Sequence, residues 1–176
     1  MFLRWRKKKI RFKCSQCGEI HDDWPAITNN APWHYHQLTE EEKNTISNLD
    51  SDFCEIKWKE QTDRFIRVVL VIPVNDTPLD LEYGLWVSLS ESSFKDYDEN
   101  CENLEHETGY FGWICNKLTG YKDTLQVPAD VIVKNGTQRP LLHLHENHDH
   151  PLVYDFLKGI SKDEAERRIH EVLNNK

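Results

Sequence analysis

The sequence lacks the features that identify several large classes of protein. No stretch approaches the roughly 20 consecutive apolar residues that a transmembrane helix needs. The basic start, MFLRWRKKK, is not followed by an apolar segment and a small-residue cleavage site, so we expect no secretory signal. There is no GxSxG, HExxH, GxGxxG or phosphate-binding glycine loop, and no internal repeat. The sequence therefore indicates neither a membrane protein nor one of the common hydrolase or nucleotide-binding families.

The five cysteines are odd in number and irregularly spaced, which does not suit a disulfide framework. Such usage is typical of reduced thiols or metal ligands, and we expect a cytoplasmic protein. Six Trp, six Tyr and seven Phe argue against disorder despite the polar average. A chain of 176 residues is long enough to form one domain with a buried core.

Charge is unevenly distributed along the chain. Residues 1–13 carry seven of the 22 Lys and Arg residues and no acid, which leaves 15 bases for a remainder that holds all 30 acids. An acidic body repels nucleic-acid phosphates, so only the segment from Arg4 to Lys13 could bind them. We predict a basic N-terminal arm, residues 1–11, followed by a single α+β domain, residues 12–176, and we expect neither a nucleic-acid nor a membrane partner.

Local patterns predict strands that follow one another through short turns, with helices at the ends. Thr39 and Glu42 form a capping box that opens a helix. Asn135-Gly136 predicts a two-residue type I′ hairpin turn. Further helices are expected over 92–107, 150–159 and 161–173, and strands over 53–58, 63–74, 81–90 and 110–117. The fold class predicted is α+β, with a mainly antiparallel meandering sheet, flanking helices and a zinc-knuckle-like N-terminal segment.

The stretch KCSQCGEIH resembles half of a metal site. Cys14 and Cys17 could place two thiolates on one zinc ion, and the glycine after them permits a tight turn. A redox pair is disfavoured because the flanking IRFK looks extended and no βαβ pattern is present. Structural zinc needs four ligands, and His21 and Cys54 are the preferred completions. Cys101 and Cys115 are better explained as small apolar residues of the core.

Four histidines gather in HLHENHDH, at His143, His145, His148 and His150. Imidazoles two residues apart on a strand point the same way, so a catalytic metal site with Glu146 or Asp149 is one interpretation. Leu142 and Leu144 occupy the opposite, core-facing positions, which favours the alternative of exposed histidines without a function.

Arg67 interrupts an apolar strand. A buried guanidinium needs a carboxylate partner, and Glu82 or Asp52 could supply one. An internal ion pair is the preferred interpretation. The alternative is a binding pocket that contains Arg67, Trp86, Trp113 and His150.

Several blocks together resemble a bacterial family, domain of unknown function 2199. They are FKCSQCGEIH, SDFC, FIRVVLVIPV, YGLWVSLSESSF, YFGWICNKLTGYKDT and RPLLHLH…HPL, over about residues 12–160. The resemblance implies a small bacterial, cytoplasmic protein and no particular activity. The matching positions are Cys14, Cys17, Gly18, His21, Cys54, Arg67, Trp86, Trp113, Cys115, His150 and Pro151. The family differs at His143, His145 and His148, which weakens a shared catalytic role for them.

The function these observations favour is a zinc-stabilised, non-enzymatic binding or regulatory domain, similar by analogy to small immunity proteins. Its acidic body would suit a basic partner protein. One alternative is a metal-dependent hydrolase that uses the histidines of residues 143–150. The other is nucleic-acid binding through the basic arm.

Overall fold

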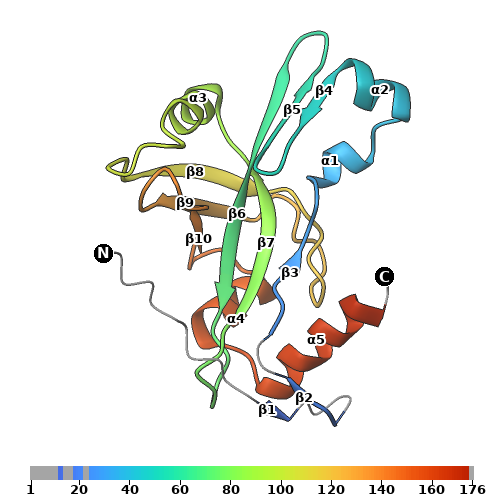
Figure 1. The fold of residues 1–176 in the computed structure, drawn as a ribbon, viewed down its shortest axis with the longest axis vertical. Coiled ribbons are helices and arrows are strands. Elements are labelled where there is room, and N and C mark those ends of the chain that lie inside the picture. The colour runs from blue at the N-terminus through green and yellow to red at the C-terminus, as the bar shows by residue number, and fades with distance from the viewer. Residues whose placement is uncertain (1–11, 14–17, 22–23, 175–176) are drawn as a thin grey trace.

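The structure is a computed structural model, and it describes residues 12–13, 18–21 and 24–174 (Figure 1). No helix in these ranges combines the length and apolar character needed to cross a membrane. The elements are β1 Phe12–Lys13, β2 Ile20–His21, β3 Ile27–Thr28, α1 Trp33–His36, α2 Glu40–Thr45, β4 Ser47–Leu49, β5 Phe53–Lys57, β6 Thr62–Ile72, β7 Leu81–Ser88, α3 Glu91–Glu99, β8 Thr108–Ile114, β9 Pro128–Val133, β10 Leu141–Leu144, α4 Pro151–Lys158 and α5 Lys162–Asn174.

Five strands close into a barrel. From β6 to β10, each strand pairs antiparallel with the next, and β10 then pairs with β6 through Leu141 and Val69. Successive strands alternate in direction, so the first and fifth run the same way and the closing pair is parallel. The prediction of an open, meandering α+β sheet is therefore wrong. The described chain forms a closed five-stranded barrel with additional strands and few helices.

The additional strands attach where the barrel strands change partners. The first half of β6 pairs with β5 over Thr62–Ile66, and its second half meets β10 at Val69 on the same edge. Likewise β7 pairs with β8 only at Val87 and Ser88, and β3 joins that edge lower down, parallel to β7. These changes of partner splay the sheet open at the top of the barrel (Figure 1).

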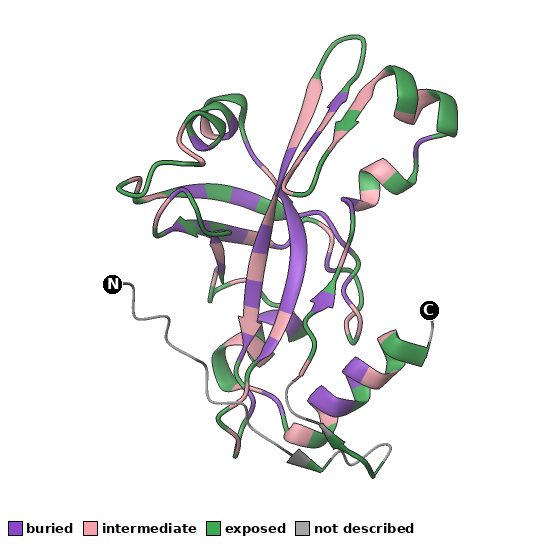
Figure 2. Cartoon of the chain, viewed as in Figure 1, coloured by how far each residue is buried: buried purple, intermediate pink, exposed green. Residues whose placement is uncertain are grey.

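The barrel interior is filled by alternate residues of its strands. Ile66, Val68 and Leu70 of β6 face Leu85 and Val87 of β7, and all five are fully buried (Figure 2). Residues two apart on a strand share a face, so the residues between them point outward. Phe94 and Tyr97 of α3, and apolar residues of α4 and α5, complete this cluster.

A second, smaller cluster covers the outer face of β5, β6 and β7. Phe65 and Trp86 point outward and are nevertheless buried, at 1% and 0% exposure, because Leu38 and the segment around α1 pack over them. This second layer explains why β6 is apolar on both faces. Each face of the strand packs against a different cluster.

The local signals for helices and turns were only partly correct. The capping box of Thr39 and Glu42 is confirmed. Strands β9 and β10 pair as predicted, with Leu141 opposite Ile132, but residues 134–140 join them in a longer loop than the predicted two-residue turn. Gly136 is required there for another reason, because a Cβ atom would lie 1.8 Å from the backbone oxygen of Asn100.

A buried polar network attaches α5 to the loop between β8 and β9. Arg168 donates hydrogen bonds to Glu164 Oε1 at 2.6 Å, to the Tyr121 hydroxyl at 2.6 Å and to Asp155 Oδ2 at 3.1 Å. Tyr121 donates in turn to Asp155 Oδ2 at 2.8 Å. A buried guanidinium with this many partners holds the C-terminal helix in one position.

The predicted zinc-knuckle-like segment contains Cys14 and Cys17, which lie outside the described residues, so the structure shows no knuckle. Its flanks are described. Strands β1 and β2 pair antiparallel, with Lys13 opposite Ile20, and Gly18 has a positive φ of 75°. Lys162 Nζ donates to the Lys13 carbonyl at 3.4 Å, which places the hairpin beside α5 at the lower end in Figure 1.

Candidate binding cleft

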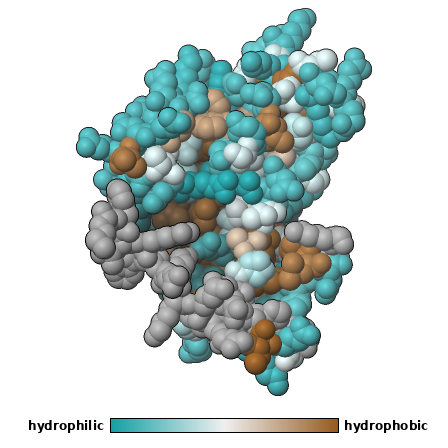
Figure 3. All heavy atoms as spheres, viewed as in Figure 1, coloured by the Kyte–Doolittle hydropathy of each residue, from teal (hydrophilic) through white to brown (hydrophobic). Residues whose placement is uncertain are grey.

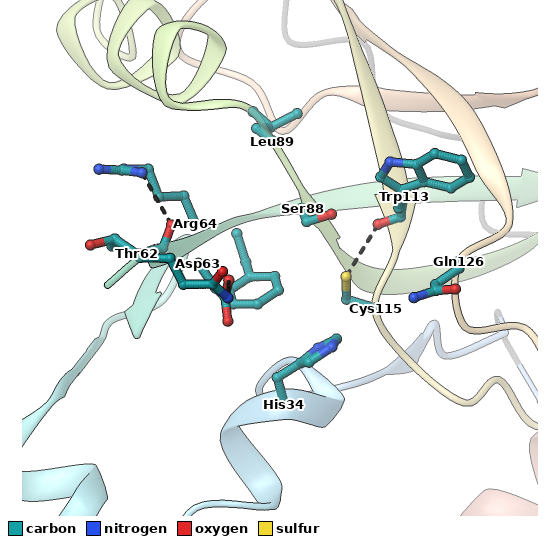
Figure 4. A pocket seen from close by; sticks show the side chains of 11 residues that line it. His34, Thr62, Asp63, Arg64, Ser88, Leu89, Trp113, Cys115 and Gln126 are labelled. Carbon is teal, nitrogen blue, oxygen red and sulfur yellow. Dashed lines mark hydrogen bonds between the residues drawn. The ribbon is translucent and has the colours of Figure 1, made fainter. Parts of the chain in front are cut away.

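An open cleft of about 580 Å³ lies where β6 extends beyond the end of β7 (Figure 4). The last residue of β7, Ser88, pairs with Phe65, and the chain then turns away through Ser90, the N-cap of α3. Residues 62–63 of β6 therefore have no β7 partner. On the opposite side, β8 ends at Ile114, so the cleft is bounded by strands that diverge.

The lining of the cleft combines a few aromatic and apolar side chains with a larger number of polar ones. The His34 ring stacks on Phe65, with centroids 5.3 Å apart and an angle of 27° between the planes. Leu89 and Trp113 belong to the lining, and Trp113 is 43% exposed. Figure 4 shows Trp113 and Gln126 on one side and residues 62–64 on the other, with His34 contributed by α1. Trp113 thus gives a largely polar lining one exposed aromatic surface that can contact an apolar group of a ligand.

The charged residues that line the cleft are Asp63 and Arg64. Arg64 interacts with Glu55 and Glu91, at 3.6 Å from each. Asp63, which lines the cleft, accepts a hydrogen bond from the indole nitrogen of Trp58 at 2.7 Å. Two carboxylates therefore flank the guanidinium. Together with Asp63, these four groups carry a formal charge of −2, which favours a ligand with positive charge.

Cys115 lines the cleft but has the properties of a structural thiol. It is 3% exposed, and its Sγ donates to the Trp113 carbonyl at 3.3 Å. Burial raises the pKa of the Cys115 thiol to about 11. Since the thiolate is the nucleophilic form, this cysteine is not prepared for covalent catalysis at neutral pH.

The structure does not bring Cys54 to the N-terminal hairpin. Cys54 lies in β5, opposite Phe65, and is fully buried in the second cluster. Burial raises the pKa of its thiol to about 12. Figure 1 places β5 at the upper end of the molecule and the hairpin at the lower end. Cys14, Cys17 and the side chain of His21 lie outside the described residues.

The predicted pocket of Arg67, Trp86, Trp113 and His150 is not assembled as one site. Of the four, only Trp113 lines the cleft. Trp86 is fully buried, and its indole nitrogen donates to the Asn29 carbonyl at 3.0 Å. The role of Trp86 is therefore to pack the second cluster.

Arg67 lies opposite Trp86 on the outer face of the barrel and donates from Nη1 to the Ser51 carbonyl at 3.3 Å. The Asp52 carboxylate, a predicted partner, accepts hydrogen bonds from Arg139 Nε at 2.5 Å and from the Ser51 hydroxyl at 2.6 Å. Burial, together with the nearby Arg139, lowers the pKa of Arg67.

His150 has a defined structural role as the N-cap of α4. Its Nδ1 accepts from the Leu152 backbone N–H at 3.0 Å, and its Nε2 lies 2.8 Å from the carbonyl oxygen of Lys122. A carbonyl only accepts, so Nε2 carries the proton and donates. His150 therefore links the start of α4 to the loop between β8 and β9.

The other histidines of residues 143–150 have separate contacts. His143 packs edge-on against Phe156 with centroids 5.0 Å apart, and His145 Nε2 lies 3.1 Å from Asp130 Oδ1. Within the described ranges, no group of three or more His, Cys, Asp or Glu side chains is placed to hold a metal ion. The arrangement gives the hydrolase hypothesis no support. The basic arm 1–11 lies outside the described residues, so its nucleic-acid binding stays a prediction.

Sequence reasoning missed the contribution of residues 31–37, APWHYHQ. This segment supplies His34 to the cleft and covers the second cluster. Its dense aromatic and histidine content, next to a proline, was the available signal. The position of the cleft depends on where β7 ends relative to β6, which local patterns do not reveal.

Comparison with known proteins adds a family and no activity. No curated protein and no solved structure matches the chain. A family model described as an uncharacterized protein conserved in bacteria, DUF2199, matches residues 13–160, which confirms the resemblance found from the sequence. Because this match covers most of the chain, the protein belongs to the bacterial DUF2199 family.

Proposed function

We propose that this protein is a non-enzymatic binding domain that holds a segment of a basic partner protein in the cleft between β6 and β8. The observation that carries the proposal is the cleft itself. It is open, its lining includes the exposed ring of Trp113, and the charged groups in and beside it are three carboxylates and one guanidinium. Arg64 already pairs with Glu55 and Glu91, and burial raises the pKa of the Cys115 thiol to about 11, so recognition explains the site better than catalysis.

The strand geometry favours an extended ligand. On the β7 side, Thr62 has no strand partner among the described residues, and its carbonyl oxygen accepts a hydrogen bond from Arg64 Nη1 at 3.1 Å. The backbone groups of Asp63 face β5, where Asp63 pairs with Ile56. An exposed strand edge beside a pocket can bind a peptide through backbone hydrogen bonds, while the pocket receives alternate side chains. The exposed ring of Trp113 would contact an apolar side chain of such a segment.

Charge favours a basic partner. Beyond residue 13 the chain has twice as many acids as bases, 30 against 15. An acidic surface accelerates the approach of a positively charged protein and repels acidic competitors. On the face shown in Figure 3, hydrophilic residues predominate among the coloured atoms and the apolar residues form separate groups. Binding through a small cleft is consistent with this surface.

Zinc is proposed as a structural component at Cys14 and Cys17. Three features support it: the spacing of the two cysteines, the positive φ of Gly18, and the pairing of Lys13 with Ile20 on either side of the motif. Two thiolates supply half of a tetrahedral site, and His21 is the nearest candidate for a third ligand. Zinc held there would stabilise the hairpin that lies beside α5.

Site-specific photocrosslinking tests the binding proposal. Benzoylphenylalanine replaces Gln61 on one wall of the cleft or Trp113 on the other, in the bacterium that encodes the protein. The control carries the same group at Leu157, an exposed position on α4. We expect one defined crosslinked protein from both cleft positions and none from Leu157, and we expect the purified partner to bind the wild-type chain reversibly.

The proposal fails if the cleft positions give the same crosslinks as Leu157. It also fails if the purified partner does not bind. A partner that is cleaved or chemically changed after incubation with the wild-type protein would show that the protein is an enzyme.

A further inference from the structure

The outer face of β8 carries two exposed aromatic rings that the barrel does not use. Phe111 and Trp113 are two residues apart, so they share the outward face, and they are 46% and 43% exposed. Their rings meet edge to face with centroids 5.0 Å apart. Two adjacent aromatic rings that are each nearly half exposed form an apolar surface patch of the kind that binds a ligand or partner.

A carboxylate stands beside the rings. Asp130 on β9 is the direct cross-strand partner of Phe111, and its side chain is 52% exposed. His145 Nε2 contacts Asp130 Oδ1 at 3.1 Å, and the His145 ring lies 5.6 Å from Phe111. The outward positions of β8, β9 and β10 are Gly109, Phe111, Trp113, Pro128, Asp130, Ile132, Leu141 and His143. Asp130 is the one formally charged residue among them.

We propose that Phe111, Trp113 and Asp130 bind an arginine side chain of the partner protein. Aromatic faces attract cations, and a planar guanidinium can stack on a ring while it donates hydrogen bonds to a carboxylate. Arginine fits better than lysine because its guanidinium is flat and more weakly hydrated. Charge complementarity supports this occupant, since the face has a carboxylate and no Lys or Arg at its outward positions.

This arginine site rests on the proposed function, because Trp113 belongs both to it and to the cleft. Alternate side chains of an extended segment are about 6.5–7 Å apart, the same spacing as Phe111 and Trp113 along β8. A partner segment seated in the cleft would therefore place a side chain over Phe111 two residues further along. The partner thus contributes an extended segment in which one residue occupies the cleft and an arginine lies two residues away from it.

Fluorescence anisotropy of labelled peptides tests the site on the full-length protein. The probes are Ser-Arg-Ser-Arg-Ser-Arg and the same peptide with lysine in place of arginine. We expect the arginine peptide to bind more tightly than the lysine peptide. Phe111→Ser and Asp130→Asn should each weaken arginine-peptide binding by about threefold to tenfold. Leu157→Ser, which removes an exposed apolar residue from α4, should leave it unchanged.

Equal affinity for the two peptides, no measurable binding of the arginine peptide, or unchanged binding in both Phe111→Ser and Asp130→Asn would overturn the arginine site. The cleft is assessed separately. If a partner crosslinks at Gln61 and binds the Phe111→Ser and Asp130→Asn variants normally, the cleft function stands and the arginine site is refuted. If the peptide results hold but no partner crosslinks at Gln61, the arginine site stands and the cleft function is refuted.

Discussion

Replacing Arg168 with methionine should remove most of the attachment between α5 and the barrel. The Arg168 side chain is 5% exposed and bonds to Glu164, Tyr121 and Asp155. Methionine keeps much of the volume but leaves Asp155 without its cation, while Glu164 keeps only its pairing with Arg167. Breaking a buried ion pair by removing one partner costs about 3–5 kcal/mol. Asp155 and Glu164 are 19% and 32% exposed and stay partly solvated, so we expect about 3 kcal/mol.

The adjacent residue provides a matched control. Arg167 is on the same helix, has the same charge and also bonds to Glu164, but it is 48% exposed. Exposed ion pairs contribute about 0–1 kcal/mol, so Arg167→Met should cost less than about 1 kcal/mol. The comparison therefore isolates the effect of burial from that of charge.

Urea unfolding followed by circular dichroism measures both variants. With a slope of about 2 kcal/mol per molar urea, Arg168→Met should lower the midpoint by about 1.5 M and Arg167→Met by less than about 0.5 M. Equal losses in the two variants, with unchanged slopes, would refute the claim that the Arg168 network is buried and anchors α5.

Three further predictions concern ionisation and zinc. Hydrogen bonds from Arg167 are the largest cause that lowers the pKa of Glu164, which falls from 4.5 to about 2 against the effect of burial. Because the pKa of Glu164 is lower in the folded than in the unfolded protein, Glu164 contributes stability above about pH 4.5 that is lost as the pH falls towards 2. The Glu164→Gln variant should therefore show a flatter dependence of stability on pH in this range. An unchanged dependence would contradict the lowered pKa of Glu164. Cys54 and Cys115 have pKa values of about 12 and 11 and are buried, so iodoacetamide at pH 8 should label Cys101 before either of them, and early labelling of Cys54 would contradict its burial. Protein purified without an affinity tag or chelator should contain zinc that Cys17→Ser lacks, and equal zinc in both would count against a site at this cysteine.

Features that depend on a few adjacent residues could be predicted from the sequence. The Thr39 capping box opens α2, and Gly159 ends α4 with a φ of 76°. The strand expected over residues 81–90 is present as β7, and its alternating residues Tyr83, Leu85 and Val87 are fully buried. Each feature depends on backbone preferences and side-chain periodicity within one helix or strand, and both can be read from the order of adjacent residues.

Features that depend on distant contacts could not be predicted. Leu141 and Val69 close the barrel although more than 70 residues separate them, and neither carries a signal for the other. Trp86 stands at an alternating position that looks exposed, yet α1 and Leu38 cover it. Gly136 suggested a tight turn, but its actual constraint is the close approach of Asn100 from another part of the chain.

The residues of the candidate site also divide into those that could be predicted from the sequence and those that could not. Trp113 was predicted as part of a pocket with Arg67, Trp86 and His150, and it lines the cleft without the other three. His34 and Leu89 were missed, because their place in the cleft follows from the point where β7 leaves the sheet. A binding site made by diverging strands is a property of the folded sheet and has no local motif.

The most direct test of the account is the affinity of the crosslinked partner for the cleft, measured by isothermal titration calorimetry. Wild type, Trp113→Ser and Leu157→Ser are titrated with the purified partner, whose mass is checked before and after. We predict that Trp113→Ser weakens binding by at least about tenfold, as expected for a central aromatic contact, that Leu157→Ser changes nothing, and that the partner is recovered intact. Equal affinity for wild type and Trp113→Ser, or a chemically altered partner, would contradict the claim that this cleft is a site of protein recognition.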